Sequence, residues 1–492
     1  MKYVSTRGDL EKVTSSAAII RGLAPDRGLY VPESIPALPC RPQEFKDISY
    51  DLAAEKILGV FLTDFTDEEI KACAKNAYDE KFDTAAIAPV VKTDKAYFLE
   101  LWHGSTAAFK DMALSILPWL LKTALKKEGE DKKIAVLTAT SGDTGKAALA
   151  GFADVAGTEI IVFYPKDGVS VVQERQMITQ SGDNVHVYGI RGNFDEAQTG
   201  VKNVFNDFSF ADELAEKGIR LSSANSINIG RLVPQVAYYV NAYAKLLQSG
   251  EIADGEKINI CVPTGNFGNI LAAWYAKQMG LPVARLICAS NENKILTDFI
   301  NTGVYDRRRE FILTSSPSMD ILVSSNLERL LWHLSGCDSE RISSLMTSLD
   351  KDGFYDAGDE TKEALGEFFG GFSAMAVSHA ALKKLWQEER YLIDTHTAVA
   401  YSVYLAYIRE TGDKTKTLIA STASPYKFAG SVAGAVGIKT DENEFNTIEI
   451  LRNETGIPLP GCLSGLDEIP VLHNEVIEKT EIGSAVKEAL QI

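Results

Sequence analysis

Residues 133–150, KIAVLTATSGDTGKAALA, decide how this chain folds. The first half is a short apolar and β-branched run typical of a buried strand, and the second half has the composition of a helix. A glycine-rich turn joins them. Further strand-like runs lie at 158–165, 184–190, 257–263, 284–290 and 416–422. Strands that alternate with helices in this way predict an α/β fold with a parallel sheet covered on both faces.

The length of 492 residues predicts about three domains, or two large ones with an appendage. Residues 1–90 lack the alternation of strand and helix patterns seen in the remainder. They have a turn-rich opening and helical patterns at 51–62 and 66–78. We expect a small N-terminal domain there. The acidic, glycine-rich segment 350–372 is interpreted as a surface insertion.

The charge balance excludes several kinds of partner. Asp and Glu outnumber Lys and Arg by 67 to 50, a net charge of −17, which argues against nucleic-acid and membrane-surface binding. No apolar run has the length of a membrane span or of a signal-peptide core. The six cysteines and six histidines are scattered without metal-site spacing, so we expect free thiols in a reducing cytoplasm and no metal. An anionic substrate would need a local island of positive charge.

Lys110 stands inside LWHGSTAAFKDMALSILPWLLKT, residues 101–123. An apolar run of this length is normally buried, and lysine is rarely buried without a partner. One interpretation is a solvated helix end, because long side chains extend readily to water. The other is a pocket lysine whose desolvated amine stays reactive toward an aldehyde. The lysine alone leaves both open.

Two glycine-rich loops follow predicted strands, where ligands of α/β sheets bind. The first, TSGDTG at 140–145, has the wrong spacing for a P-loop, which excludes a P-loop kinase. The second, TGNFGN at 264–269, is not a dinucleotide fingerprint, but its amides suit one terminal phosphate. Either loop alone could be an ordinary turn between a strand and a helix, with no ligand. Together with a pocket lysine, they match the needs of pyridoxal phosphate.

The motifs HGSTAAFKDMA (103–113), TATSGDTG (138–145), NSINIGRLVPQ (225–235) and PTGNFGN (263–269) resemble those of the threonine synthase family. YPKDGVS, SPSMDI, DTHTAVAY and the opening MKYVSTRG fit the same family in its order, so the resemblance covers nearly the whole chain. It implies a pyridoxal 5'-phosphate enzyme of the tryptophan-synthase-β-like fold, with two parallel-sheet α/β domains and a small N-terminal domain. The domains implied are 1–90, a large cofactor domain from 91–132 with 245–440, a smaller mobile domain over 133–244, and a C-terminal loop and helix over 441–492 that packs on the large domain.

The resemblance also implies the reaction. O-phospho-L-homoserine and water become L-threonine and phosphate, the last step of threonine biosynthesis. The partner would be this small molecule, with no nucleic acid and no membrane, and the protein would be a cytoplasmic monomer or homodimer. Two alternatives remain. A threonine or serine dehydratase would share the cofactor site but lack a second anion site, and a catalytically silent cofactor-binding relative would turn over no phosphorylated amino acid.

Site residues follow from the resemblance position by position. Lys110 would bind the cofactor aldehyde as a Schiff base and then act as a base at the substrate's α-carbon. Thr422 would face the ring nitrogen and leave it largely unprotonated, although it could equally be a strand-end threonine that bonds backbone. The cradle for the cofactor phosphate would be Gly265, Asn266, Phe267, Gly268 and Asn269.

The substrate site is carried over in the same way. Arg231 would stabilise the departing phosphate, although a lone helical arginine is usually a surface residue. The full set of substrate-binding candidates is Ser141, Asp143, Thr144, Asn225, Asn228 and Arg231. Three positions depart from the family pattern beside key residues, namely Thr395, Ala400 and Ser424, where we expect proline, glycine and histidine.

Overall fold

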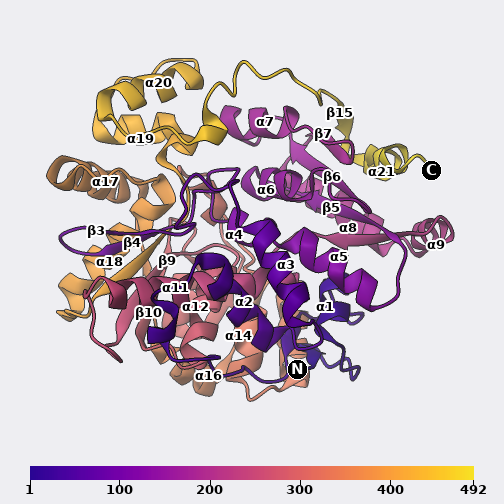
Figure 1. Ribbon diagram of the computed structural model, residues 1–492, viewed down its shortest axis with the longest axis horizontal. Coiled ribbons are helices and arrows are strands. Elements are labelled where there is room, and N and C mark those ends of the chain that lie inside the picture. Colours follow the sequence, from indigo (N-terminus) through magenta and orange to yellow (C-terminus); the bar gives the residue numbers. More distant parts are fainter.

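The computed structural model describes residues 1–492, apart from the side chains of Asp195, Asn206 and Phe208. Two units, each built on a mainly parallel sheet, lie side by side (Figure 1). In the larger sheet, of order β13-β10-β9-β14-β4-β3, only β3 runs antiparallel to its neighbour. Its strands are β3 (Val90–Lys92), β4 (Tyr97–Glu100), β9 (Ile258–Pro263), β10 (Val283–Ser290), β13 (Phe368–Phe372) and β14 (Thr417–Ser421).

The smaller sheet has the order β15-β7-β6-β5-β8 and is parallel throughout. Its strands are β5 (Lys133–Ala139), β6 (Thr158–Pro165), β7 (Val185–Arg191), β8 (Ile219–Ser223) and β15 (Val476–Glu478). The helices of this unit are α6 (Asp143–Phe152), α7 (Val171–Ile178), α8 (Phe194–Asn206), α9 (Phe208–Glu216) and α21 (Ile482–Leu490). These bounds confirm the α/β class that the alternating pattern predicts.

The larger unit carries most of the remaining helices. Those nearest the site are α4 (Asp111–Leu114), α5 (Leu117–Lys127), α10 (Ile229–Leu232), α11 (Pro234–Gln248) and α12 (Gly268–Gln278), with the 3₁₀ helices η2 (Pro317–Met319) and η4 (Pro425–Phe428). Further out lie α13 (Ile295–Thr302), α14 (Leu327–Leu334), α15 (Ser339–Asp352), α16 (Gly358–Ala364), α17 (Met375–Glu389), α18 (Thr395–Thr411) and α19 (Ala429–Val436), and a two-stranded antiparallel sheet of β11 (Val304–Asp306) and β12 (Phe354–Asp356).

The N-terminal segment packs on the larger unit. It contains β1 (Tyr3–Ser5), β2 (Tyr30–Pro32), α1 (Ser15–Arg21), α2 (Tyr50–Phe61) and α3 (Asp67–Ala77). Helix α1 contacts α5, and α2 contacts α11. One continuous apolar cluster joins the residues of this segment to those of α11, α12 and both sheets. The segment therefore shares a core with the larger unit.

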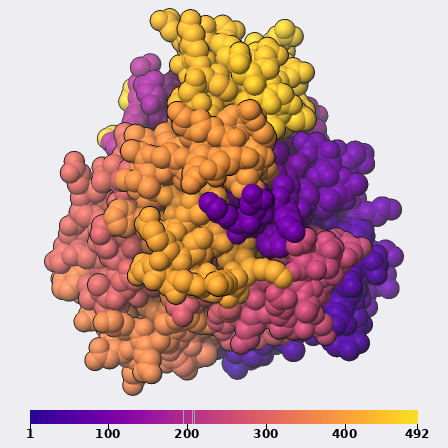
Figure 2. Space-filling model, turned by 90° about the vertical axis from the view of Figure 1, so that its left-hand side faces the viewer, coloured from indigo at the N-terminus to yellow at the C-terminus, as the bar shows by residue number. Residues whose placement is uncertain are grey.

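The unit boundaries differ in two places from the expected ones. Helix α11, expected in the smaller unit, packs on α2 and α12 of the larger one. The C-terminal segment was expected on the large domain. Its first helix, α20 (Glu444–Thr455), packs on α19, but β15 pairs with β7 and α21 packs on α8, both in the smaller unit. Pairing with β15 satisfies the backbone groups of β7, which would otherwise be an open sheet edge. Figure 2 shows these C-terminal residues, in yellow, gathered at the top of the molecule.

The segment 350–372, expected to be a surface insertion, contributes an edge strand instead. Its last residues form β13, which pairs with β10 in parallel. The pair Gly370 and Gly371 weakens the strand pattern in the sequence, but close approach explains it. A Cβ at Gly371 would lie 2.6 Å from the Val403 side chain, and one at Gly370 would lie 3.0 Å from the Thr297 carbonyl oxygen. Strand glycines often mark such approaches.

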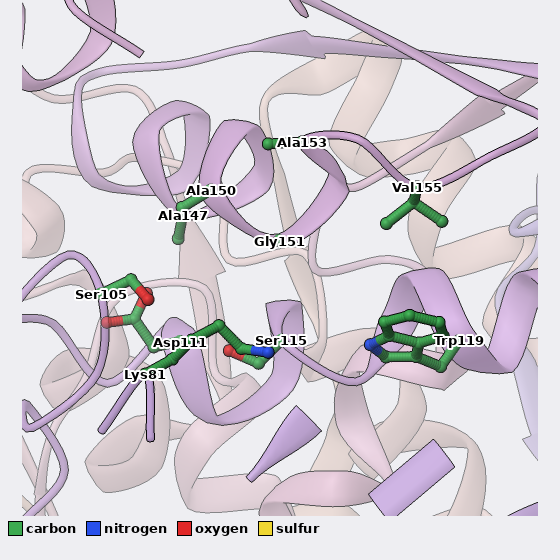
Figure 3. A pocket seen from close by; sticks show the side chains of 10 residues that line it. All are labelled: Lys81, Ser105, Asp111, Ser115, Trp119, Ala147, Ala150, Gly151, Ala153 and Val155. Atoms are coloured by element: carbon green, nitrogen blue, oxygen red, sulfur yellow. The ribbon is translucent and has the colours of Figure 1, made fainter. Parts of the chain in front are cut away.

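The two units approach most closely where α6 crosses α4. A Cβ built on Gly151 of α6 would lie 2.2 Å from the carbonyl oxygen of Leu114. Figure 3 shows a pocket beside this contact, with Ala147 and Ala150 of α6 facing Asp111 and Ser115 of the larger unit. The absence of a side chain at residue 151 is thus what lets the helices meet.

We expect Gly151→Ala to destabilise the fold by about 1–3 kcal/mol, because the added methyl overlaps backbone that cannot rotate away. Urea unfolding followed by circular dichroism measures this. Gly430→Ala in α19, with no atom within 4 Å of the added Cβ, is the matched control and should be neutral or stabilising by up to about 1 kcal/mol. Equal unfolding midpoints for the two variants would contradict the tight contact.

Candidate active site

The segment that carries Lys110 is fixed by pairing with the residues after β14. Phe109 N–H donates to the Thr422 carbonyl (2.8 Å), and Ser424 N–H donates to the Ala107 carbonyl (3.0 Å). Ala107 has a positive φ of 55°, an uncommon conformation for a residue with a side chain, which turns the chain into α4. This pairing sets Lys110 close to Thr422 although more than 300 residues separate them in the sequence.

The Lys110 amine is not solvated. Its side chain is 11% exposed, and Nζ lies 3.2 Å from Asp143 Oδ2 and 3.3 Å from Ser318 Oγ. Burial lowers the pKa of Lys110, the positive charges of Lys427 and Arg231 lower it further, and Asp143 opposes them. A lowered pKa raises the fraction of neutral amine near pH 7, the form that reacts with an aldehyde.

Asp143 occupies the first position of α6 and receives hydrogen bonds from both units. Oδ1 accepts from Lys427 Nζ (2.8 Å) and from Gln173 Nε2 (2.9 Å), and Oδ2 accepts from Ser318 Oγ (3.2 Å) in addition to Lys110. Burial alone would raise the pKa of Asp143, but Lys110 and Lys427 hold it well below its ordinary value. The carboxylate is therefore ionised and fully engaged.

The loop before α6 is held by Thr140. Its Oγ1 accepts from the backbone N–H groups of Gly142 (3.0 Å) and Gly145 (2.8 Å). Gly142 has a φ of 125°, which suits glycine. Ser141 is exposed and Thr144 is half-buried, so both lie at the surface of this loop, whereas Asp143 points inward.

The loop 264–269 has its carbonyl groups tied back. Ser324 Oγ donates to the Gly265 carbonyl (2.7 Å), and Asn326 donates to the Asn266 carbonyl from its backbone (3.1 Å) and from Nδ2 (2.9 Å). Phe267 has a left-handed φ of 63° and begins α12. Consecutive amides at a helix start with the carbonyls held away form an anion-binding concavity.

Asn269 links this loop to α11. Its Oδ1 accepts from Tyr238 (2.9 Å) and from the Tyr239 hydroxyl. Its Nδ2 is buried and, within the described structure, has no hydrogen-bond partner. An unpaired buried donor is costly, so this amide is a candidate donor to a bound group.

Arg231, in α10, is 4% exposed and has no carboxylate partner among the described side chains. One nitrogen, Nη1, donates to the Ala224 carbonyl (2.8 Å), and Nε is buried without a partner. Burial lowers its pKa to about 10. A surface arginine would be hydrated, so the structure instead presents a desolvated guanidinium that lacks an anion.

The remaining predicted residues have mixed surroundings. Both polar atoms of the Asn228 side chain are used, because Nδ2 donates to the Ile19 carbonyl (2.9 Å) and Oδ1 accepts from Gly230 N–H (2.9 Å). This favours helix capping over ligand binding, and its substrate role stays a prediction. Asn225 is half-buried in the turn before α10. Thr422 N–H donates to Thr397 Oγ1 (3.3 Å), and its side chain is 6% exposed beside Lys110.

Sequence reasoning missed several residues of this site. Lys427 is fully buried against Asp143, and Ser318 touches both Lys110 and Asp143. Ser318 N–H donates to His396 Nε2 (3.1 Å), whose Nδ1 lies 3.1 Å from Asp394 Oδ1. The motifs SPSMDI and DTHTAVAY contain these residues, so the motifs signalled the place without giving the contacts.

Arg329, also missed, connects the loop 264–269 to the turn before α10. It donates to the carbonyls of Tyr30 (3.0 Å) and Ile227 and to Asn326 Oδ1. Asn326 holds the loop 264–269, and Ile227 lies in the turn before α10. The N-terminal segment therefore reaches the site through Arg329.

Comparisons with known proteins identify the family of this chain. The family model "Threonine synthase N terminus" matches residues 2–78, and "Pyridoxal-phosphate dependent enzyme" matches residues 85–422. "Threonine synthase" of Schizosaccharomyces pombe is 36% identical, with 91% of each chain covered. The structure of "PLP bound Threonine synthase from Brucella melitensis" is 34% identical with a TM-score of 0.87, and each chain is fully covered.

The chain belongs to the threonine synthase family. Its cofactor is pyridoxal phosphate, and the family consists of cofactor-dependent lyases. "Threonine synthase-like 1" of Homo sapiens is 38% identical over 97% of this chain, but the chain spans only 65% of that relative's length. Within the described structure, no helix is long and apolar enough to span a bilayer.

The residues present fit this cofactor. Lys110 offers a buried amine of lowered pKa, and the loop 264–269 offers amides with the unpaired Asn269 Nδ2. Arg231 is linked to that loop through two side chains: Gln235 Nε2 donates to the Arg231 carbonyl (2.8 Å), and the Tyr238 hydroxyl lies 3.0 Å from Gln235 Oε1 and 2.9 Å from Asn269 Oδ1. The site therefore has places for two anionic groups, one at the loop and one at Arg231.

The contrast between the two buried arginines gives a prediction. We expect Arg231→Met to leave the stability of the cofactor-loaded protein unchanged or higher, because it removes an unpaired buried charge. Arg329→Met should destabilise by roughly 3 kcal/mol or more, because several buried oxygens lose their donor. Thermal unfolding measures both.

The same variants test the ligand. Inorganic phosphate should raise the melting temperature of the wild type in proportion to the logarithm of its concentration, and this gain should vanish in Arg231→Met. An equal phosphate response in the wild type and Arg231→Met would remove Arg231 from the anion site.

Proposed function

We propose that the protein converts O-phospho-L-homoserine and water to L-threonine and phosphate. The observation that carries this proposal is the buried Arg231 guanidinium, whose Nε has no hydrogen-bond partner within the described structure and whose positive charge acts on Lys110. A cofactor phosphate would occupy the loop 264–269, which would leave Arg231 for a second anion. A dehydratase substrate has no second anionic group beyond its carboxylate.

The local charge balance supports a phosphorylated substrate. Among the described side chains, Lys110 and Lys427 both contact the Asp143 carboxylate, and the positive charge of Arg231 acts on Lys110. This is a positive island in a chain whose net charge is −17. A phosphate monoester carries about −1.5 to −2 near pH 7 and would offset the surplus.

The chain's own residues would divide the work. Bound pyridoxal phosphate supplies an aldehyde for the substrate amine and an electron-withdrawing ring beside the α-carbon. Lys110 holds the cofactor and, once released, takes the α-proton, for which a neutral amine is required. Arg231 stabilises the charge that develops on the leaving phosphate. Thr422, which offers a hydroxyl and not a carboxylate, would face the ring nitrogen.

The experiment that tests the function is a product analysis. The cofactor-loaded protein should release phosphate and L-threonine in equal amounts from O-phospho-L-homoserine. Formation of 2-oxobutanoate from threonine, with no turnover of phosphohomoserine, would assign a dehydratase. The absence of turnover with any phosphorylated amino acid would assign a silent relative.

Lys110→Ala should keep cofactor binding without covalent attachment, because the loop 264–269 is unchanged. Activity should fall by at least the ~10²–10⁴-fold expected for a lost acid–base group. Borohydride reduction followed by peptide mapping of the wild type should label Lys110. A label on Lys146 or Lys427 instead, or near-normal turnover by the variant, would contradict the assignment.

A further inference from the structure

A second lysine lies behind the first. Lys427, in η4, has no exposed surface, and its Nζ donates to the Thr106 carbonyl (2.9 Å) and to Asp143 Oδ1 (2.8 Å). The two oxygens of Asp143 are thus divided, one toward Lys427 and Gln173, the other toward Lys110 and Ser318. A fully buried lysine is rare and needs a reason.

Charged side chains from several neighbouring elements surround Lys110 and Lys427. Asp143 on α6, Lys427 on η4 and Arg231 on α10 act on Lys110. Lys427 itself acts on Asp143, on Asp111 of α4, on Lys146 of α6 and on Cys462, a thiol whose pKa burial raises to about 12. Burial also raises the pKa of Asp111, which hydrogen-bonds Thr106. Among the described side chains, Asp143 is therefore the one carboxylate that contacts both lysines.

We propose that Lys427 is a positioning residue, which holds Asp143 between the two units and favours the neutral form of the Lys110 amine for its reaction with an aldehyde. The inference rests on the proposed role of Lys110. Lys427 touches neither substrate nor cofactor in this arrangement and acts through Asp143.

The physical argument has a definite sign. A carboxylate next to an amine stabilises the ammonium form, and a second cation nearby destabilises it. With Lys427 present, both lysines bind Asp143, and the positive charge of Lys427 disfavours the ammonium form of Lys110. Without Lys427, Asp143 would pair with Lys110 alone, and the pKa of Lys110 would rise. Below that pKa each unit of increase lowers the neutral fraction tenfold.

The same contact explains the geometry of α6. Lys427 belongs to the larger unit and Asp143 to the smaller, so their ion pair joins the two units. When Lys110 turns toward a bound aldehyde, Lys427, Gln173 and Ser318 still hold the carboxylate. The start of α6 then stays in place while the reactive lysine moves.

The test uses the full chain without cofactor and measures the amine directly. Trace acetylation with acetic anhydride across pH 6–11, followed by peptide mass spectrometry, gives the reactivity of Lys110 as a function of pH. Lys427→Met should move the inflection upward by about one pH unit or more, with about tenfold lower reactivity near pH 7. Lys427→Arg, which keeps the charge, should leave the inflection close to that of the wild type.

Two further variants separate this proposal from a loss of structure. Asp143→Asn removes the opposing charge and should move the Lys110 inflection downward, opposite to Lys427→Met. Lys146→Met is the matched control, because Lys146 is a buried lysine that bonds Gln180 and does not contact Asp143. It should leave the Lys110 profile unchanged. Circular dichroism of each variant checks folding.

The outcomes are distinct. The proposal is overturned if the pH of the Lys110 inflection in Lys427→Met is unchanged or lower than in the wild type. If Lys427→Met does not fold, Asp143→Asn decides, and an inflection that is not lowered there overturns the proposal. The measurement needs neither cofactor nor substrate. Failure of the protein to make threonine therefore bears on the proposed function alone, and the Lys110 profile bears on Lys427 alone.

Discussion

The carboxylate of Asp143 is the interaction on which the site depends. It stands at the first position of α6, where the partial positive charge of a helix N-terminus favours an anion, and it binds two lysines from the other unit. A buried ion is tolerable only if its oxygens are fully hydrogen-bonded, and both oxygens of Asp143 are. The residue thereby fixes Lys110, the start of α6 and the seam between the units at once.

Two buried arginines show how the same side chain serves structure and ligand binding. Arg329 donates hydrogen bonds to backbone and amide oxygens. It thereby holds together the turn before α10, the loop near Asn266 and the N-terminal segment. Arg231 uses one nitrogen for the Ala224 carbonyl and leaves Nε unpaired. Since the fold gains little from burying such a group, the unpaired donor supports the proposed role of Arg231 in binding an anion. Burial alone would not distinguish the two residues.

The sequence predicted β5, β6, β7, β9, β10 and β14 because each is a short apolar, β-branched run, whereas β3, β4 and β8 of the same sheets were not predicted. The strand at 158–165 was predicted without error, and the other five lie within one residue of their expected ends. β13 was missed because Gly370 and Gly371, needed for close packing, remove the side chains that mark a strand. β15 was missed because three residues carry too weak a pattern, and only pairing with β7 makes them a strand.

The sequence predicted the parts of the candidate site that lie in short local motifs. Lys110 and the loop 264–269 are recognisable because a reactive amine and a phosphate cradle each need a distinctive short stretch. Lys427 was not recognisable, since a lysine in SPYKF has an ordinary local sequence and its burial arises from contacts with Thr106 and Asp143, both about 300 residues away. Such a residue becomes visible only when the two units are together. The electrostatic setting of the reactive lysine is therefore a tertiary property of the fold, although the lysine itself can be found from the sequence.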